Sequence, residues 1–329
     1  MPASRHLIDR ARVLLLLGGL ALSGLFAYLA VRKVRWTEVW DALQTSSYWW
    51  LVPALLLLIC ANVVRADRWQ SMFAPETRPA FGPTLEAMLV GQFFNNILPA
   101  RAGEAARVIV LHRRAAASRA ETTATVVLER AFDVLALLVL LFIVLPWFPK
   151  VSWLLAAALL AIGLTVALTL LVVMLARFGE RPLLLAFRPL RLLPFVPTEL
   201  IERAAAHLAR GLTSIRRPGV AARATFWTLG SWLLIAASNW TLMRGFDLGL
   251  SVAAGLLVAI TTGLGMIIPS APGAIGVYEA ATLVALGAYG VPNSRAFSYA
   301  LVLHAMNLLP YLVAGAVVLR LDRWLRRRH

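Results

Sequence analysis

Cysteine, lysine and charged residues in general are scarce in this sequence. Only 15% of its 329 residues are charged, and Cys60 is its single cysteine. One cysteine excludes an intrachain disulfide and a metal site built from cysteines. Ordinary soluble domains are about 25% charged and need a polar surface to cover their core. With 60% hydrophobic residues, this composition excludes a soluble protein and leaves lipid to face much of the chain.

Familiar catalytic and cofactor motifs are also absent. The sequence has no Gly-x-x-x-x-Gly-Lys-Ser/Thr loop, no His-Glu-x-x-His, no Asp-Asp-x-x-Asp and no nucleophile elbow. We therefore expect no cofactor and no metal, and we expect the protein not to be an enzyme. The alternative is a membrane-embedded lipid-modifying enzyme that uses two carboxylates for acid–base work or for binding a metal–diphosphate.

Eight hydrophobic stretches are candidates for membrane-spanning helices, since about 20 apolar residues cross the hydrocarbon layer. They lie at residues 13–31, 48–64, 122–146, 151–176, 224–243, 248–268, 273–291 and 296–319. The first runs for 19 residues without a charge, longer than a signal-peptide core of about 7–15 residues, so we interpret it as a retained span. The predicted fold class is an all-α polytopic membrane protein with about eight transmembrane helices and two broken or re-entrant segments.

Basic residues are unevenly distributed between these spans. Residues 1–12, 65–121, 177–223 and 320–329 hold 3, 8, 9 and 5 arginines, which is 25 of the 32 basic residues. The loops on the other side hold 6. The positive-inside rule therefore predicts that both termini are cytoplasmic, in a bacterial inner membrane. Because the arginines follow the topology, the net charge of +16 does not indicate nucleic-acid binding.

The stretch 85–98 is apolar but too short for a span, and it ends at Pro99. Its length is typical of a re-entrant or interfacial segment. Charged residues then separate it from a second apolar piece at 108–111, as at the tip of a hairpin. The polar and charged residues of this region are Gln92, Asn95, Asn96, Arg101, Glu104 and Arg107.

A second break at 267–276 has a similar pattern. In both breaks two aliphatic residues precede a proline, and a glycine follows four positions later, at Gly103 and at Gly273. Paired breaks at corresponding places indicate a transporter site. Pro272 and Gly273 precede the seventh span, where a helix N-terminus attracts anions, although a plain turn is the alternative reading.

The breaks suggest an internal repeat within one transmembrane domain, 1–329. The halves are 1–176 and 224–319, and a cytoplasmic amphipathic segment, 177–223, joins them. Within it, 198–217 fits either an interfacial helix or a solvated connector. Four spans in each half make the repeats parallel, whereas an inverted repeat needs an odd number.

Three charges lie inside the third span, at Glu129, Arg130 and Asp133. A charge in hydrocarbon costs at least ~2.5–3.5 kcal/mol, so these side chains must face the bundle interior or water. Glu129 and Asp133 are i and i+4 and share a helix face. A functional site and a structural ion-pair network, for example Arg130 with Glu279, both fit.

Arg65 and Arg68 end the second span on its cytoplasmic side, next to Trp69. Tryptophan and arginine are ordinary interface anchors. A guanidinium also forms paired hydrogen bonds to phosphate, so both arginines are candidates for gripping a lipid headgroup.

Taken in order, these residues form four motifs. They are Arg65-x-x-Arg68-Trp69, Asn95-x-x-Leu98-Pro99-x-Arg101-x-Gly103-Glu104-x-x-Arg107, Glu129-Arg130-x-x-Asp133 and Pro269-x-x-Pro272-Gly273-x-Ile275-Gly276-x-x-Glu279. The ordered set resembles the lysylphosphatidylglycerol synthase transmembrane-region family, also called flippase-like domains. The resemblance covers roughly residues 13–319.

This resemblance implies lipid translocation, because the membrane domain of two-domain members flips aminoacylated phosphatidylglycerol. The soluble aminoacyltransferase domain is absent from the 329 residues, so we expect that the chain does not make such a lipid itself. The family usually has Gly-Gly after the second proline, where this chain has Gly273-Ala274. Stand-alone relatives are linked to hopanoids and glycosylated polyprenyl carriers, which leaves the substrate open.

The sequence therefore predicts a flippase for an anionic phospholipid, a polyprenyl phosphate or a hopanoid. A lipid-modifying enzyme and a non-transporting partner of a lipid or glycan biosynthetic complex are the alternatives. A homo-oligomer or a separate lipid-synthesising enzyme is a candidate partner. The candidate substrate-binding residues are Arg65, Arg68, Asn95, Asn96, Arg101, Glu104, Arg107, Glu129, Arg130, Asp133, Pro272, Gly273 and Glu279.

Overall fold

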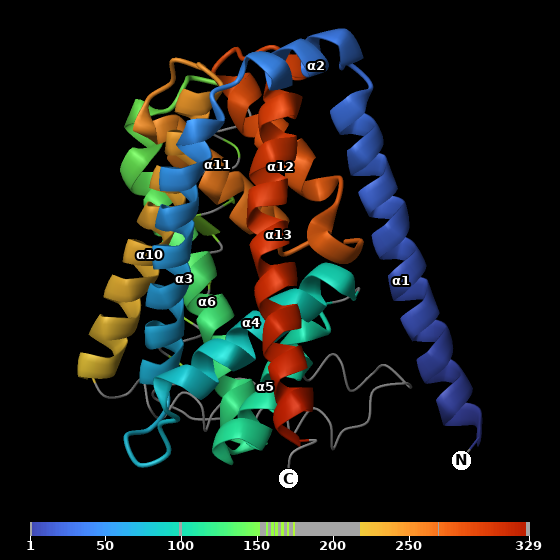
Figure 1. Cartoon of the computed structure of the whole chain (residues 1–329), viewed down its shortest axis with the longest axis vertical. Coiled ribbons are helices and arrows are strands. Elements are labelled where there is room, and N and C mark those ends of the chain that lie inside the picture. Colours follow the sequence, from blue (N-terminus) through green and yellow to red (C-terminus); the bar gives the residue numbers. More distant parts are fainter. Residues whose placement is uncertain are drawn as a thin grey trace.

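The computed structural model describes residues 2–98, 101–151, 218–268 and 270–326, with isolated positions between 156 and 174 (Figure 1). Every regular element in this part of the chain is a helix, which confirms the predicted all-α class. Most of the predicted span 151–176 lies outside the described residues. So does the predicted amphipathic segment 177–223, up to residue 217.

Helices α1 (Pro2–Val31) and α2 (Trp36–Thr45) meet at a bend of 79°. In Figure 1, α2 lies across the upper end of the bundle while α1 descends at its side. Val39 of α2 is buried, whereas Trp36 and Trp40 are exposed on one helix face. Exposed tryptophans are typical of the membrane–water interface. The sequence predicted only a loop here, and the structure has a helix.

Long helices cross the body of the molecule. They are α3 (Leu51–Ser71), preceded by the 3₁₀ turn η1 (Tyr48–Trp50), α6 (Arg119–Val144), α10 (Pro218–Gly245) and α13 (Asn293–Arg326). Among the described residues, three helices are long and apolar enough to cross a membrane, at 48–71, 219–245 and 293–321. The bent pair α1–α2 makes a fourth if it is one span. α6 has 26 residues, but its charged side chains interrupt the apolar run.

Two pairs of shorter helices form hairpins that approach each other from opposite ends of the bundle (Figure 1). The first pair is α4 (Phe81–Ile97) and α5 (Gly103–Ala115). The second pair is α11 (Val252–Gly265) and α12 (Val277–Ala288), with the 3₁₀ turn η5 (Pro272–Ala274) at the tip between them. The tip of the second hairpin contacts α4, so the two hairpins meet inside the bundle.

The second hairpin corrects the two spans predicted at 248–268 and 273–291. α11 has 14 residues and α12 has 12, which are about 21 and 18 Å long at 1.5 Å per residue. Neither reaches across a hydrocarbon layer of about 30 Å. Apolar residues also lie in the turn before α11 and in the break after Gly265, where the chain is not helical. The apolar stretch in the sequence is therefore longer than the helix.

The order of a long helix, a hairpin and a long helix occurs twice, as α3 to α6 and as α10 to α13. In Figure 1, α3 and α10 run in opposite directions, and so do α6 and α13. Helices that run in opposite directions indicate an inverted arrangement of the two halves. The four spans predicted in each half would instead make the halves parallel. The internal repeat itself stays a prediction. α1 begins and α13 ends at the same end of the bundle.

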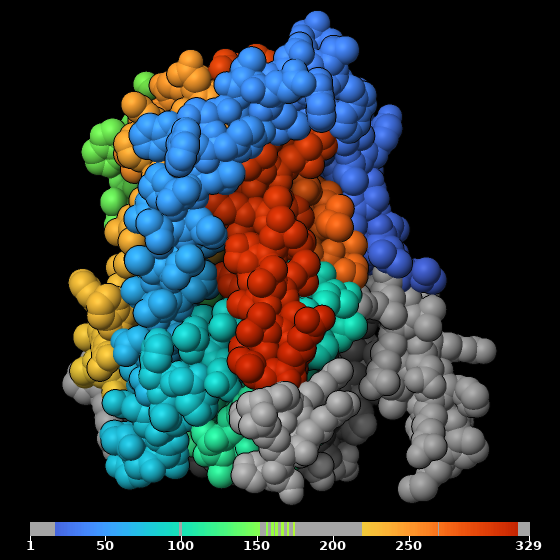
Figure 2. Space-filling view, in the orientation of Figure 1, coloured from blue at the N-terminus to red at the C-terminus, as the bar shows by residue number. Residues whose placement is uncertain are grey.

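Close packing in the α4–α5 hairpin depends on glycine. A Cβ atom at Gly103 would overlap the carbonyl oxygen of Gly91, so the two helices cross with their backbones in contact. The N–H of Gly103 donates to Oδ1 of Asn95 at 2.9 Å and fixes the start of α5. Figure 2 shows α13 in red on the surface beside this hairpin, where Leu309, Val313 and Val317 are exposed.

Candidate functional site

Three segments that are distant in the sequence bring their charged side chains together. They are the end of α3, the α4–α5 hairpin and the first half of α6, and the described part of α10 closes the group from another side. Four of the eight charged residues are buried. This fits the rule that charges within a membrane protein face its interior and pair with one another. This charge cluster consists of Arg65, Arg68, Arg101, Glu104, Arg107, Glu129, Arg130 and Asp133.

Arg68 lies at the centre of the cluster and is fully buried. Its Nη1 donates to Asp133 Oδ1 at 2.7 Å and to Thr228 Oγ1 at 2.9 Å, and its Nη2 lies 3.1 Å from Glu129 Oε1. Trp232 Nε1 also donates to Asp133 Oδ1, at 3.3 Å. Because Glu129 and Asp133 are one helical turn apart, a single guanidinium reaches both carboxylates.

Arg107 occupies the other side of Glu129. Its Nη2 donates to Glu129 Oε2 at 2.7 Å, so each oxygen of this carboxylate faces an arginine. The Arg107 guanidinium carbon lies 3.9 Å from the ring centroid of Trp69, a cation–π contact. Trp69 in turn donates from Nε1 to Thr125 Oγ1 at 3.1 Å, which fixes the ring between α3 and α6.

Arg130 closes the network near the hairpin. Its Nε lies 3.3 Å from Glu104 Oε1, its Nη2 3.4 Å from Glu129 Oε1 and its Nη1 3.7 Å from Asp133 Oδ2. The pairing of Arg130 with Glu279 that the sequence suggested is not formed. Arg130 lies on α6 and Glu279 lies on α12, and carboxylates on α5 and α6 pair with Arg130 instead.

Arg65 and Arg101 are the cluster residues that form no ion pair within the described part of the chain. Both are partly buried. The guanidinium of Arg65 lies 4.6 Å from the ring centroid of Trp232, and its buried Nε has no hydrogen-bond partner among described groups. Arg101 lies at the hairpin tip with φ 54°. The cluster thus has five arginines for three carboxylates, an excess of two positive charges.

A second polar group lies at the tip of the α11–α12 hairpin. His304 of α13 contacts Glu279 Oε1 through Nδ1 at 2.5 Å and the carbonyl oxygen of Gly273 through Nε2 at 2.8 Å. The other oxygen of Glu279 accepts from the N–H of Gly276 at 2.7 Å. Tyr278 stacks on the imidazole, with centroids 4.6 Å apart. We call Gly273, Gly276, Glu279 and His304 the hairpin-tip group.

The structure divides the candidate residues between these two groups. Gly273 and Glu279 belong to the hairpin-tip group, and Pro272 begins its 3₁₀ turn. Asn95 is used inside its own hairpin, and the carbonyl of Asn96 lies beside Gly273, 3.6 Å from where a Cβ would stand. The anion site expected at this helix start is partly taken, since Glu279 already accepts from the N–H of Gly276.

Sequence reasoning missed His304 and the aromatic partners of the arginines. A histidine in the middle of an apolar helix is itself a signal, because a polar side chain there needs a partner. The sequence gives no means of telling which partner that is, since Glu279 is 25 residues away. Trp232 and Thr228 come from α10 and could not be assigned to the cluster without the fold.

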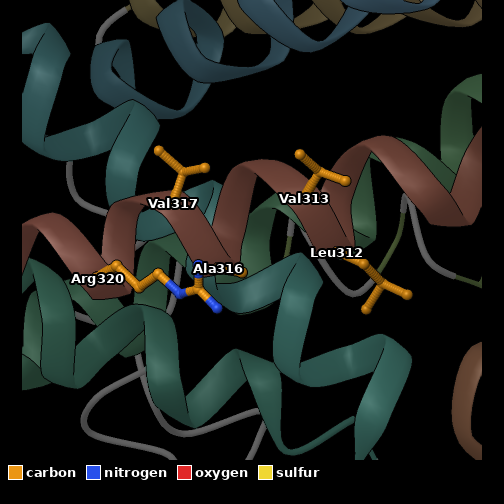
Figure 3. A pocket seen from close by; sticks show the side chains of 5 residues that line it. All are labelled: Leu312, Val313, Ala316, Val317 and Arg320. Atoms are coloured by element: carbon orange, nitrogen blue, oxygen red, sulfur yellow. The ribbon is translucent and has the colours of Figure 1, made fainter.

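A shallow pocket of about 340 Å³ lies apart from both groups (Figure 3). Its lining residues come from α13 alone, and Figure 3 shows four apolar side chains with the Arg320 guanidinium at one end. They are Leu312, Val313, Ala316, Val317 and Arg320. Among the described residues, no three histidine, cysteine or carboxylate side chains gather as metal ligands would.

Comparison with known protein families identifies a match over most of the sequence. The family model described as lysylphosphatidylglycerol synthase TM region matches residues 16–315, which is nearly the whole chain. No curated protein matches the sequence.

Proposed function

Since the chain belongs to the lysylphosphatidylglycerol synthase TM region family, we propose that it is a lipid translocase. Its substrate is an anionic lipid or a polyprenyl-phosphate-linked lipid, which it moves across the bacterial inner membrane with both termini in the cytoplasm. The observation that carries the proposal is the excess of two arginines in the charge cluster.

The headgroup site follows from the arginines that the protein leaves without a carboxylate. Arg65 lies against the aromatic ring of Trp232 and Arg101 lies at the hairpin tip, and neither forms an ion pair with a carboxylate of the described chain. A guanidinium binds phosphate oxygens through two parallel N–H bonds, which suits a phosphodiester or phosphomonoester. Glu104 Oε2 is buried without a hydrogen-bond partner among described groups, and it suits a hydroxyl or amine on the headgroup.

The acyl chains have an apolar exit beside this site. Ile97 and Leu98, at the tip of the first hairpin, are 46% and 39% exposed, although they lie next to charged Arg101. Ile267 and Ile275, at the second hairpin, are 49% and 56% exposed. A polar headgroup path bordered by exposed aliphatic side chains matches a lipid, whose two ends need opposite environments.

Enzymatic chemistry is less well supported by the same geometry. Glu129 and Asp133, the pair considered for acid–base work, both accept short hydrogen bonds from arginines. A carboxylate that is fully engaged by guanidinium groups is a poor general base, because those contacts stabilise its charged form and oppose its uptake of a proton. We therefore propose that the protein binds and moves its lipid without modifying it.

The direct test is transport in reconstituted vesicles. Purified protein is placed in phosphatidylcholine vesicles with a fluorescent anionic phospholipid, and a membrane-impermeant reductant reports the lipid that reaches the outer leaflet. We expect Arg65→Gln and Arg101→Gln to lower the initial transport rate at least about tenfold, because each removes a charged hydrogen-bond donor worth about 1.5–3 kcal/mol. Labelled polyprenyl phosphate is the second substrate.

Arg223→Gln is the matched control. Arg223 pairs with Asp67 on the exposed side of α10, at 2.8 Å, outside the charge cluster. This variant is expected to transport at the rate of the unchanged protein. Transport that is normal in both cluster variants, or equally slow in the control, contradicts the site. Folding of each variant is checked by its thermal unfolding in detergent.

A further inference from the structure

The hydrogen bonds of His304 require more protons than its neutral ring carries. Nε2 faces the carbonyl oxygen of Gly273, which can only accept, and Nδ1 faces Glu279 Oε1. A neutral imidazole has one N–H and one bare nitrogen. Both contacts are therefore satisfied only when the pair holds one further proton, either as imidazolium with carboxylate or as imidazole with a protonated Glu279.

We infer that the Glu279–His304 pair is a proton-binding site that fastens the tip of the α11–α12 hairpin. Loss of the proton leaves two acceptors facing each other at one of the two contacts. Because a charged carboxylate is a stronger acceptor than a backbone carbonyl, the remaining ring N–H stays with Glu279 and the bond to Gly273 is lost. The tip then keeps its bond to α1, from the N–H of Ala271 to Ser23 Oγ at 2.7 Å, and loses its bond to α13.

The surroundings leave this pair as the proton-sensitive group of the tip. Glu279 forms no ion pair with an arginine of the described chain, and α1, α4 and α11 approach the tip through Ser23, the Asn96 carbonyl and Thr262. The titratable neighbours are phenols, which stay neutral across the pH range of the test. They are Tyr278 of α12 and Tyr299 and Tyr311 of α13.

The position of the pair gives the proton a mechanical effect. Gly273 has φ +67° and lies against the carbonyl of Asn96, at the contact between the two hairpins. Gly273 has no side chain to anchor it, so within the described part of the chain its hydrogen-bonded link to α13 is the bond to His304. The proton site does not depend on which lipid is bound. Its use in opening the headgroup path rests on the proposed function.

A spin label on the tip tests the site without any transport measurement. Cys60 is exposed and is replaced by serine, and Ile275→Cys carries a nitroxide in phosphatidylcholine nanodiscs. From about pH 5 to about pH 9, which spans histidine titration, we expect the ratio of mobile to immobile label to rise about tenfold. A tenfold change corresponds to about 1.4 kcal/mol, the size of one buried hydrogen bond.

Glu279→Gln separates the proton from the hydrogen bonds. Its amide oxygen accepts from Gly276, its NH₂ donates to Nδ1 of His304, and the neutral ring donates to Gly273. The label is expected to stay immobile at every pH. His304→Phe keeps the stacking on Tyr278 but loses both bonds, and its label is expected to be mobile at every pH. His112→Gln, on α5, is the matched control and keeps the full pH response.

The outcomes distinguish this inference from the proposed function. A label that ignores pH in the unchanged pair, or a Glu279→Gln protein with the full pH response, overturns the proton site. If the label behaves as expected while vesicles show no lipid movement, the proton site stands and the translocase proposal falls. If vesicles show lipid movement while the label does not respond to pH, the translocase proposal stands and the proton site falls.

Discussion

Arg68 shows how far a single buried charge in this protein depends on its neighbours. Its guanidinium is fully buried and contacts Glu129, Asp133 and the hydroxyl of Thr228. Burying such charges is costly, and their mutual attraction repays the cost only when the geometry is good. Removing one partner leaves the others buried without a counter-charge. This destabilises the protein more than replacing the whole pair by apolar residues does.

Arg68→Met is therefore expected to destabilise the protein by about 3–5 kcal/mol. The methionine fills a similar volume but leaves Asp133 without its 2.7 Å ion pair and Glu129 without one of its arginines. Denaturant unfolding in detergent, followed by helix content, measures the loss. Arg223→Met removes a pair that is half exposed and is expected to cost at most about 1 kcal/mol. Equal losses in the two variants contradict the central position of Arg68.

The sequence was most informative at this scale where a charge stood in an apolar run. The insertion cost alone predicted that Glu129, Arg130 and Asp133 face the bundle interior or water, and Arg68 reaches the two carboxylates. It could not choose their partners, because Arg107 and Trp232 reach the cluster only through the fold. His304 was not among the candidate residues, and its two hydrogen-bond partners could not be chosen from the sequence.

At the scale of elements, the hairpins were partly predictable. Pro99 correctly ended the first short helix, since a proline disfavours helix at the residue before it. α11 and α12 were expected to be full spans, because hydropathy does not distinguish helical from irregular apolar residues. α2 was missed for the opposite reason, since its 10 residues mix tryptophan with charge and give no long apolar run.

Adding one methyl group at Gly103 tests whether the close contact between α4 and α5 is needed for stability. Gly103→Ala places a Cβ atom onto the carbonyl oxygen of Gly91, so the helices must separate. We expect a loss of about 1–3 kcal/mol, the usual cost of overpacking, together with slower lipid transport because Arg101 and Glu104 move with the tip. Thermal unfolding and the vesicle assay measure the two effects. Gly82→Ala on the same hairpin meets no atom within 4 Å and should be neutral.

At the scale of the whole molecule, the two hairpins enter from opposite ends and meet inside. The end that holds both chain termini also holds the loop before α4, whereas the turn between α12 and α13 lies at the other end (Figure 1). In the proposed translocase, opposed hairpins of this kind allow the headgroup site to face either side of the membrane. The positive-inside rule predicts that the end with the termini is cytoplasmic.

Two single-cysteine proteins test this orientation in a Cys60→Ser background. Pro75→Cys lies in the loop before α4, and Asn293→Cys begins α13 at the other end. A membrane-impermeant maleimide should label position 293 in right-side-out vesicles and position 75 only in inverted ones. Labelling of both positions from the same side excludes the arrangement, and exchanged labelling reverses the predicted orientation.

The bond between Ser23 of α1 and Ala271 has a consequence for biosynthesis. Its partners are separated by 248 residues, so α1 enters the membrane long before the hairpin tip that it contacts has been made. At about 5–20 residues per second, the ribosome needs roughly 10–50 s to cover that interval. During this time α1 is already in the membrane, but the hairpin tip that it contacts has not yet been synthesised. Its docking onto α12 is a late event of assembly and marks the moment when the second hairpin is complete.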